Sequence, residues 1–158
     1  MARPSSEIVE IRGASPSDAV AIRALTRAAY AKWVPLIGRE PLAMLADYDR
    51  ALREHQIDLL FADAQLSGLI ETMIEKDHLF IVNVAVAPSR QGRGYGRRLL
   101  DHAEALAAAL RLPEARLTTN KQFAANIALY LRLGYAIDRE EPFMGGVMTH
   151  MMKRMATA

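Results

Sequence analysis

The chain has 158 residues and a formal net charge of +2, and it contains no cysteine. Its 51% hydrophobic and 24% charged residues are typical of a globular protein, and the length suits one domain over residues 1–158. No apolar run approaches the ~20 residues of a membrane span, and the first residues lack the apolar core of a signal peptide. We therefore expect a cytoplasmic protein with no membrane or nucleic-acid partner, no disulfide and no cysteine-based metal site.

The N-terminal part predicts a strand followed by a helix. Residues 8–12 alternate apolar and polar side chains, as a half-buried strand does. Ser15 suits an N-cap, Pro16 suits the first helical position, and Asp18 complements the helix dipole. The residues expected to face inward repeat with helical spacing: Ile22, Leu25 and Ala29.

Residues 30–41 break this period, because they bring two prolines, a glycine and the single tryptophan into one stretch. We expect a loop there. A second helix is predicted over residues 42–55, with one stripe of side chains on its inner face: Leu45, Tyr48 and Leu52.

Three apolar runs follow, at residues 57–62, 66–74 and 79–86. The polar breaks between them are short enough only for antiparallel hairpins. The helix that begins near Gly96 leads to a further apolar strand at residues 115–119, and a helix between two strands predicts a parallel pair.

The C-terminal part predicts one more helix and two more strands. The helix covers residues 122–133 and ends at Gly134, a typical C-terminal cap. Strands are expected at residues 135–139 and 147–155, with a loop at 140–146. The elements together predict a mixed sheet of about seven strands in the α/β (α+β) class.

A glycine-rich turn between the strand at 79–86 and the next helix predicts a phosphate site. Gly92, Gly94 and Gly96 remove the side chains that would keep an anion away from the unpaired N–H groups of the first helical turn. Arginines at a helix start oppose the dipole, and a bound polyphosphate would reverse that penalty. Four surround this turn: Arg90, Arg93, Arg97 and Arg98.

The spacing of these glycines excludes two common nucleotide-binding motifs. Counted from Gly92, the third glycine of a dinucleotide G-x-G-x-x-G motif would be Arg97. Counted from Gly94, it would be Leu99, and the strand at 115–119 ends without the acidic residue that holds a ribose. A Walker loop is excluded because the chain has no Gly-Lys pair.

What remains is Gln91-x-x-Gly94-x-Gly96 after a Val-Ala-Val-x-Pro strand end. Here the sequence resembles the GNAT superfamily of acetyl-CoA-dependent N-acetyltransferases. The resemblance implies a mostly antiparallel sheet with about four helices packed on both faces. It also implies acetyl-CoA as the cofactor, with its pyrophosphate wrapped by this turn.

A second stretch is similar to the other hallmark of this family. Asn126 and Tyr130 stand four residues apart, on one helical face, and Gly134-Tyr135 follows. The resemblance implies that the Tyr130 hydroxyl acts as a general acid toward the thioester sulfur, which suits a phenol of pKa near ~10. The implied coenzyme-binding residues are Val84, Ala85, Val86, Gln91, Gly92, Arg93, Gly94, Tyr95, Gly96, Arg97 and Asn126.

Attack of an amine on a thioester also needs a neutral amine, and hence a base or desolvation. Many relatives carry a glutamate directly before the asparagine of the central strand, whereas this chain has Val82 there. Glu71 on the neighbouring strand is a base candidate, His78 and His150 are further candidates, and a water chain could serve instead. The residues implied to contact the acceptor are Tyr30, Trp33 and Asn83.

The resemblance thus implies acetyl transfer from acetyl-CoA to a primary amine of a small molecule or peptide, without a metal. The alternative is a non-catalytic acyl-CoA-binding sensor on the same fold, which would need the turn at 91–96 but not Tyr130. The arginine cluster gives weaker support to nucleic-acid binding, because it lacks interleaved aromatic residues. The identity of the amine stays open, and a homodimer is compatible with the sequence.

Overall fold

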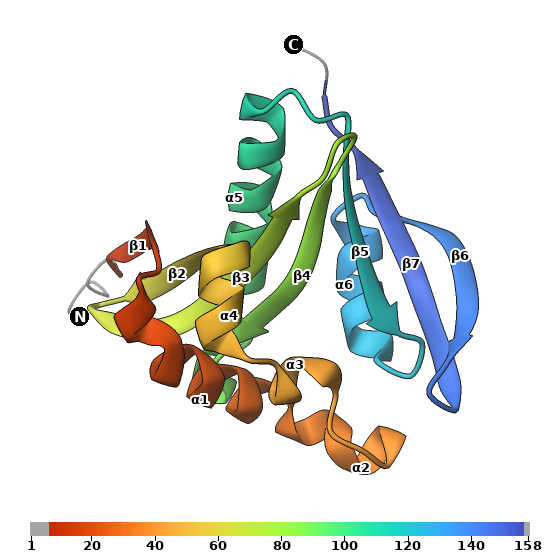
Figure 1. Ribbon diagram of the computed structural model, residues 1–158, viewed down its shortest axis with the longest axis horizontal. Helices are drawn as coiled ribbons and strands as arrows, with labels where there is room; N and C mark the ends of the chain where they lie inside the picture. The colour runs from red at the N-terminus through yellow and green to blue at the C-terminus, as the bar shows by residue number, and fades with distance from the viewer. Residues whose placement is uncertain (1–6, 157–158) are drawn as a thin grey trace, which may run out of the picture.

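The computed structural model describes residues 7–156, which form a seven-stranded sheet in the order β1-β2-β3-β4-β5-β7-β6 (Figure 1). Neighbouring strands pair antiparallel, apart from the parallel pair β4 and β5. This confirms the predicted mixed and mostly antiparallel sheet. The strands are β1 (Val9–Gly13), β2 (Gln56–Ala62), β3 (Gln65–Ile74), β4 (Leu79–Val86), β5 (Glu114–Asn120), β6 (Ala136–Phe143) and β7 (Gly146–Arg154).

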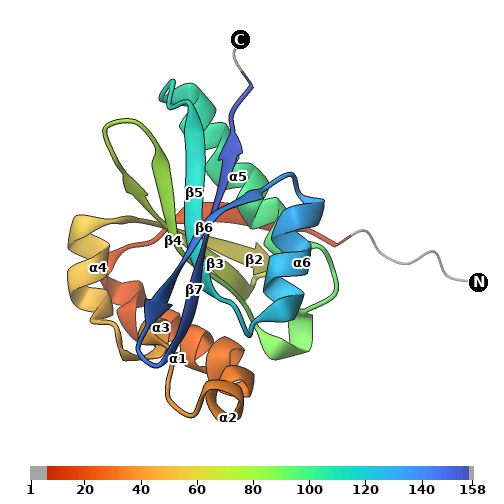
Figure 2. The same ribbon diagram turned by 90° about the vertical axis from the view of Figure 1, so that its right-hand side faces the viewer.

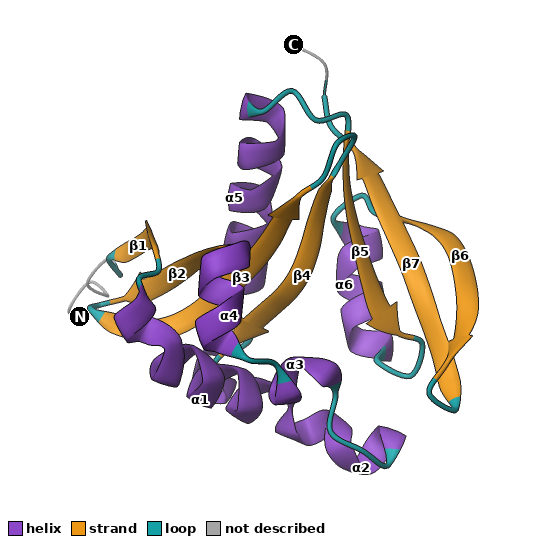
Figure 3. Ribbon diagram, in the orientation of Figure 1, coloured by secondary structure: helices purple, strands orange, loops and turns teal. Residues whose placement is uncertain are grey.

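Helices pack on both faces of the sheet, as expected (Figure 3). Helices α1 and α4 cover one face, and α5 and α6 pack on the other. Figure 2 shows the strands of the sheet between α4 and α6. Short 3₁₀ turns lie at Pro16–Asp18, Ala31–Trp33 and Pro88–Arg90. The α-helices are α1 (Ala19–Tyr30), α2 (Val34–Ile37), α3 (Leu42–Leu45), α4 (Tyr48–Glu54), α5 (Tyr95–Ala109) and α6 (Ala124–Arg132).

The prediction of a single helix over residues 42–55 is wrong, because the helix is interrupted between α3 and α4. Ala46 is extended, with φ −66° and ψ 148°, and the Asp47 side chain caps α4 by accepting a hydrogen bond from the Arg50 N–H at 3.1 Å. The break turns Leu45 outward, with 61% of it exposed, while Tyr48 is buried.

Two predicted loops are also more regular than expected. Residues 30–41 contain the helical turn Val34–Ile37, which ends at Gly38 in the left-handed conformation. Residues 140–146 mostly continue β6 and turn tightly into β7 at Met144 and Gly145.

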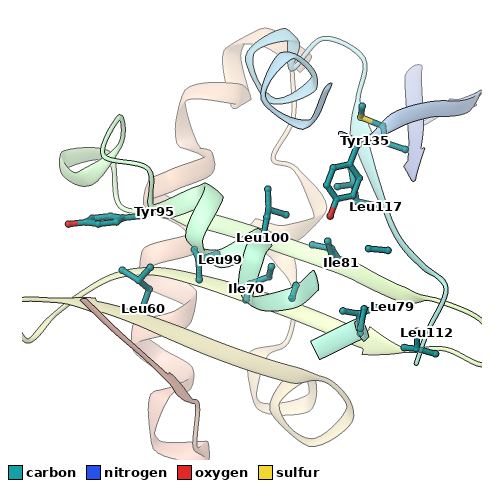
Figure 4. Packing of buried hydrophobic residues seen from close by; sticks show 14 of the residues in the cluster. Leu60, Ile70, Leu79, Ile81, Tyr95, Leu99, Leu100, Leu112, Leu117 and Tyr135 are labelled. Atoms are coloured by element: carbon teal, nitrogen blue, oxygen red, sulfur yellow. The ribbon is translucent and has the colours of Figure 1, made fainter. Parts of the chain in front are cut away.

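The core between the sheet and α5 fixes the position of the glycine-rich turn. Leu99 and Leu100 of α5 pack with Leu60 of β2 and Ile70 of β3, and each of the four is at most 1% exposed (Figure 4). Burying a side chain of this size contributes ~1.5–3 kcal/mol. Because α5 follows β4 directly, this packing also holds the turn that joins them.

A β-bulge at Val82 reverses which side chains of β4 face each helix layer. Ile81 pairs with Thr72 and Asn83 pairs with Glu71, so Val82 is the extra residue of the bulge. Before the bulge, Ile81 belongs to the core beneath α5. After it, the Asn83 side chain faces α1 and α4. The bulge thus turns Asn83 toward the same layer as Glu71.

Strands β4 and β5 pair only at one end and then separate. The pairing joins Leu79–Ile81 to Ala115–Leu117, although β4 continues to Val86 and β5 to Asn120. Figure 1 shows the two strands diverging from their shared end. The second half of β4 therefore presents backbone groups to a gap instead of to a neighbouring strand.

Candidate active site

A cavity of about 510 Å³ lies at the gap between β4 and β5. Its walls come from α4 and the segments before it, from β3, β4, β5 and α6, and from the turn between β6 and β7. The predicted site residues that line it are Tyr30, Glu71, Asn83, Val84, Asn126 and Tyr130, and the bulged Val82 lines it too. Among the described residues, Trp33, Ala85, Val86 and the turn at 91–97 were also predicted as site residues but lie outside this lining.

Tyr130 reaches the cavity from α6 and is held by the turn that ends this helix. Gly134 has φ 95°, and this left-handed turn lets the Tyr135 N–H donate to the Tyr130 carbonyl at 3.0 Å. The two rings pack edge to face with centroids 6.0 Å apart. Burial raises the pKa of Tyr130 to about 12, so its hydroxyl stays protonated at neutral pH.

The second half of β4 offers N–H groups to the gap. In an antiparallel strand the N–H and C=O of one residue point to the same side. The Val86 carbonyl accepts a hydrogen bond from the Gln91 side chain, and the Val84 carbonyl lies 3.5 Å from the Tyr30 hydroxyl, so both residues point away from β3. Val84 and Val86 therefore direct their N–H groups into the gap, while the intervening Ala85 is paired with β3.

Asn83 is the centre of a buried polar cluster on the α1 side of β4. The Tyr30 hydroxyl donates to Asn83 Oδ1 at 2.8 Å, and the Asn83 amide lies 3.4 Å from the hydroxyl oxygens of Thr26 and Tyr48. Burial, and to a smaller extent the nearby Tyr130, raises the pKa of Tyr30 above its usual value. Both the oxygen and the nitrogen of the Asn83 amide have partners within the protein. Asn83 therefore fixes the orientation of Tyr30 and has little capacity left to bind a substrate.

Glu71 is buried beside this cluster and is paired with a residue that sequence analysis missed. It is 4% exposed and pairs with Asn83 across β3 and β4. Nδ1 of His55 lies 2.5 Å from Glu71 Oε2. His55 directly follows α4 and also lines the cavity. No spacing motif links these two residues, and only the strand register brings them together.

The other histidine candidates lie elsewhere. His78 pairs with Asp77 in the turn between β3 and β4, and His150 of β7 pairs with Glu141 of β6. Neither belongs to the cavity lining within the described part of the chain. They are therefore poorly placed to accept a proton from a substrate in this cavity.

The glycine-rich turn has the backbone of an anion site. Gly92 and Gly94 have φ 79° and 81°, which only glycine adopts readily, and an added Cβ at either would meet nothing within 4 Å. Gly94 caps α5, whose first turn contains no acidic residue. The first N–H groups of the helix have no helical partner, so the open turn fits a pyrophosphate.

The side chains around this turn differ in their exposure and in their partners. Tyr95, predicted to contact coenzyme, is only 2% exposed, and its ring packs in the core, so its backbone N–H is the group left to face an anion (Figure 4). Arg93 lies 3.6 Å from Glu7, whereas Arg97 is largely exposed. Gln91 accepts a hydrogen bond from Lys32 at 3.2 Å, which ties the turn to the segment after α1.

The family model of the acetyltransferase (GNAT) family matches residues 22–135. The chain belongs to the GNAT family of acetyltransferases. It is therefore an acetyl-CoA-dependent acyltransferase, as its motifs implied. No curated protein matches the chain.

Solved structures of GNAT proteins share this fold. The PaiA N-acetyltransferase of Thermoplasma acidophilum, solved with coenzyme A, has a TM-score of 0.80 at 21% identity, over 93% of this chain and 99% of that one. The ribosomal-protein-S18-alanine N-acetyltransferase of Escherichia coli has a TM-score of 0.78 at 20% identity, over 96% of each chain. The yncA protein of Salmonella typhimurium, solved with its cofactor acetyl-CoA, has a TM-score of 0.73 at 18% identity, again over 96% of each.

Two further observations bear on partners. Within residues 7–156, no helix is both long and apolar enough to cross a membrane. The same residues contain no group of three or more acidic, histidine or cysteine side chains arranged to hold a metal ion.

Proposed function

We propose that this GNAT protein transfers the acetyl group of acetyl-CoA to a primary amine of a small molecule or peptide, by direct attack of the amine on the thioester. One observation carries this proposal: Val84 and Tyr130 line the same cavity, and the N–H groups of Val84 and Val86 point toward the gap in which this cavity lies. A carbonyl held by the strand would then have its sulfur within the reach of a proton donor.

We assign coenzyme binding to the turn at 91–97 and to the start of α6 as part of this proposal. The open backbone at Gly92 and Gly94 suits the pyrophosphate, and the exposed side chain of Arg97 adds positive charge. Asn126 lines the cavity near Tyr130, where its amide can hydrogen-bond the coenzyme arm. Acetyl-CoA supplies an activated acyl group, and the remaining steps depend on the protein.

The chain's own groups then perform three tasks. The Val84 and Val86 N–H groups polarise the acetyl carbonyl, which stabilises negative charge as the amine attacks. Tyr130 protonates the departing thiolate, and its raised pKa keeps it in the required neutral form. Tyr30, fixed by Asn83, forms part of the acceptor wall beside the reacting carbonyl.

The cavity wall also suits an amine that carries an apolar group. Leu42, Phe80 and Phe143 supply apolar surface, and the carboxylate of Glu71 lines the same cavity. An ammonium substrate would be attracted to this carboxylate and would bury its carbon skeleton against the aromatic rings.

A screen of amines with acetyl-CoA, read as release of free thiol, tests the proposal. We expect one class of primary amine to be turned over, and acetyl-CoA to raise the melting temperature because it binds the native state. Stabilisation by acetyl-CoA without turnover of any amine in a broad screen would instead support a non-catalytic acyl-CoA sensor. Calorimetry that detects no coenzyme A binding would reject both alternatives.

A further inference from the structure

An amine substrate reaches the cavity carrying a proton that it must lose before it can attack. Alkylammonium groups have pKa values near ~10.4, so at neutral pH nearly all of the substrate is in the charged form. Several acidic groups in the cavity wall already have partners. Glu54 pairs with Arg50 at 2.9 Å, and Asp47 caps α4. The His55–Glu71 pair remains as a candidate acceptor.

The geometry of this pair favours one tautomer of its imidazole. A buried carboxylate is unfavourable unless it is hydrogen-bonded, and Glu71 is paired with His55 Nδ1 at 2.5 Å. In its ionised form a carboxylate can only accept a hydrogen bond, and pairing with that form places the imidazole hydrogen on Nδ1. Nε2 is then left with a free lone pair, which makes it the ring atom able to take up a proton.

The pair also lies close to the site of acetyl transfer. Glu71 pairs with Asn83, the neighbour of Val84 on β4. After burial, the largest contributions to the raised pKa of Tyr30 come from Tyr130, Tyr48 and Glu71. Tyr30 is therefore near both the proposed acid and Glu71, within one cavity.

We propose that His55 accepts the proton of the substrate ammonium, and that Glu71 acts as a positioning residue that fixes the imidazole ring and its tautomer. This proposal rests on the proposed N-acetyltransferase function. His55 is the catalytic residue in this account, because it lines the cavity that receives the amine, whereas Glu71 acts through it.

The protons of the reaction balance as follows. The ammonium gives one proton to Nε2 of His55 and becomes a neutral amine. Its nitrogen forms the C–N bond as the C–S bond breaks, and the thiolate takes the proton of the Tyr130 hydroxyl. The second proton leaving the nitrogen restores Tyr130, and His55 releases its proton to solvent. The net products are the amide, the free thiol and one proton.

The ionisable side chains that line the cavity together with His55 come from several elements. The pair partner Glu71 comes from β3, Tyr30 comes from α1, and Arg39 precedes α3. Charged and phenolic side chains of α4 and its cap complete the set: Asp47, Tyr48, Arg50 and Glu54. Arg50 is paired with Glu54 at 2.9 Å, and Glu71 is the carboxylate in direct contact with the imidazole.

A matched control lies on the opposite face of the sheet. Nε2 of His102 on α5 is 3.2 Å from Oδ2 of Asp58, and Asp58 is 7% exposed. This is also a histidine beside a buried carboxylate, but it lies outside the cavity lining. Removing His102 therefore tests the loss of a histidine–carboxylate pair without touching the proposed proton path.

The decisive variant is His55→Gln, because glutamine can still donate to Glu71 but cannot accept a proton. We expect it to fold, to bind acetyl-CoA as the wild type does, and to lose at least ~10²-fold in kcat near neutral pH. The acidic limb of the kcat/KM profile should also be lost. Wild-type kcat and an unchanged pH profile in a folded His55→Gln protein would overturn the proposal.

Two further measurements separate proton transfer from a structural role. Added imidazole should partly restore turnover to His55→Ala and should have no effect on His102→Ala, whose own turnover should match the wild type. The Nδ1 proton of His55 should give a downfield NMR resonance that disappears in Glu71→Gln. Absence of that resonance from the wild type would reject the pairing itself.

Failure of this proposal can be told apart from failure of the function. If the wild type acetylates an amine and His55→Gln does so equally well, only the role of the pair is wrong. If the wild type binds acetyl-CoA and acetylates no amine, the proposed function fails and this proposal fails with it.

Discussion

The ring of Trp33 stacks on the ring of Phe123, with centroids 4.4 Å apart and an interplanar angle of 22°. Trp33 ends the 3₁₀ turn after α1, and Phe123 immediately precedes α6. The stack therefore joins the layer that holds Tyr30 to the helix that holds Tyr130, across the gap between β4 and β5. The stack gives Trp33 a bridging role next to the cavity, because Phe123 is one of the residues that line it.

We predict that Trp33→Ala lowers the free energy of unfolding by roughly 2 kcal/mol, because it removes both apolar burial and an aromatic pair. It should also raise KM for the amine, since the stack no longer holds α1 and α6 in fixed positions relative to each other. Urea denaturation and steady-state kinetics measure the two effects. Trp33→Phe keeps a stacking ring and should recover most of the stability; equal stability of all three proteins would show that the stack contributes little.

Gly94→Glu should abolish acetyl-CoA binding by bringing bulk and negative charge to the start of α5. Left-handed backbone at a non-glycine residue costs ~1–2 kcal/mol, so some loss of stability is expected as well. Gly145→Glu is the matched control, because Gly145 has φ 79° and equally open surroundings in the turn between β6 and β7. Isothermal titration of both variants with coenzyme A tests this prediction. Tight binding by Gly94→Glu would show that the phosphate site does not lie at this turn.

Local patterns predicted most of the fold, and the errors have physical causes. The apolar stripe from Leu45 to Leu52 keeps helical spacing through residues that are not helical, because the Asp47 cap starts a new helix inside it. Residues 140–146 suggested a loop since they are charged and contain Pro142. They form part of β6, an edge strand with mostly exposed side chains, where proline is tolerated.

The residues of the candidate site also fall into two groups, those that the sequence predicts and those that only the structure brings together. The turn at 91–97 is contiguous in sequence, so its glycines and arginines could be recognised directly. The pairing of His55 with Glu71 depends on the register of β2, β3 and β4, and the facing of Asn83 depends on a bulge at Val82. Neither register nor bulge leaves a periodic signal, so sequence analysis selected Glu71 without its partner.

We predict that the protein loses stability steeply between pH ~10 and ~12. Burial raises the pKa of Tyr48 and of Tyr130 to about 12, and it raises the pKa values of Tyr30 and Tyr135 as well. Phenols in the unfolded chain titrate near ~10. The unfolded state therefore releases protons that the native state still holds, so stability is complete below pH ~10 and falls as pH rises toward the native pKa values.

Melting temperatures across this pH range, together with tyrosinate absorbance, measure the effect. Tyr130→Phe removes one of the buried phenols and should make the alkaline loss less steep. A melting temperature that stays constant to pH ~11 would mean that these phenols are not buried in solution.

The last prediction concerns Tyr130, whose hydroxyl we propose to assist departure of the thiolate only as the C–S bond breaks. An interaction made in the transition state alone lowers kcat and kcat/KM together when it is removed. Tyr130→Phe should therefore lose ~10²-fold in both parameters, while coenzyme affinity stays close to that of the wild type. A residual rate should remain, because the proposed contacts of the Val84 and Val86 N–H groups with the carbonyl would be kept.

Tyr135→Phe provides the matched control for this loss. Tyr135 packs edge to face on Tyr130, but its hydroxyl donates to Glu104 at 3.2 Å, and it lies outside the cavity lining. Its removal should lower the free energy of unfolding by ~1 kcal/mol and leave kcat unchanged. If Tyr130→Phe keeps wild-type turnover where chemistry limits the rate, the phenol is not the acid. Equal losses in the two variants would indicate that packing around α6, and not proton donation, sets the rate.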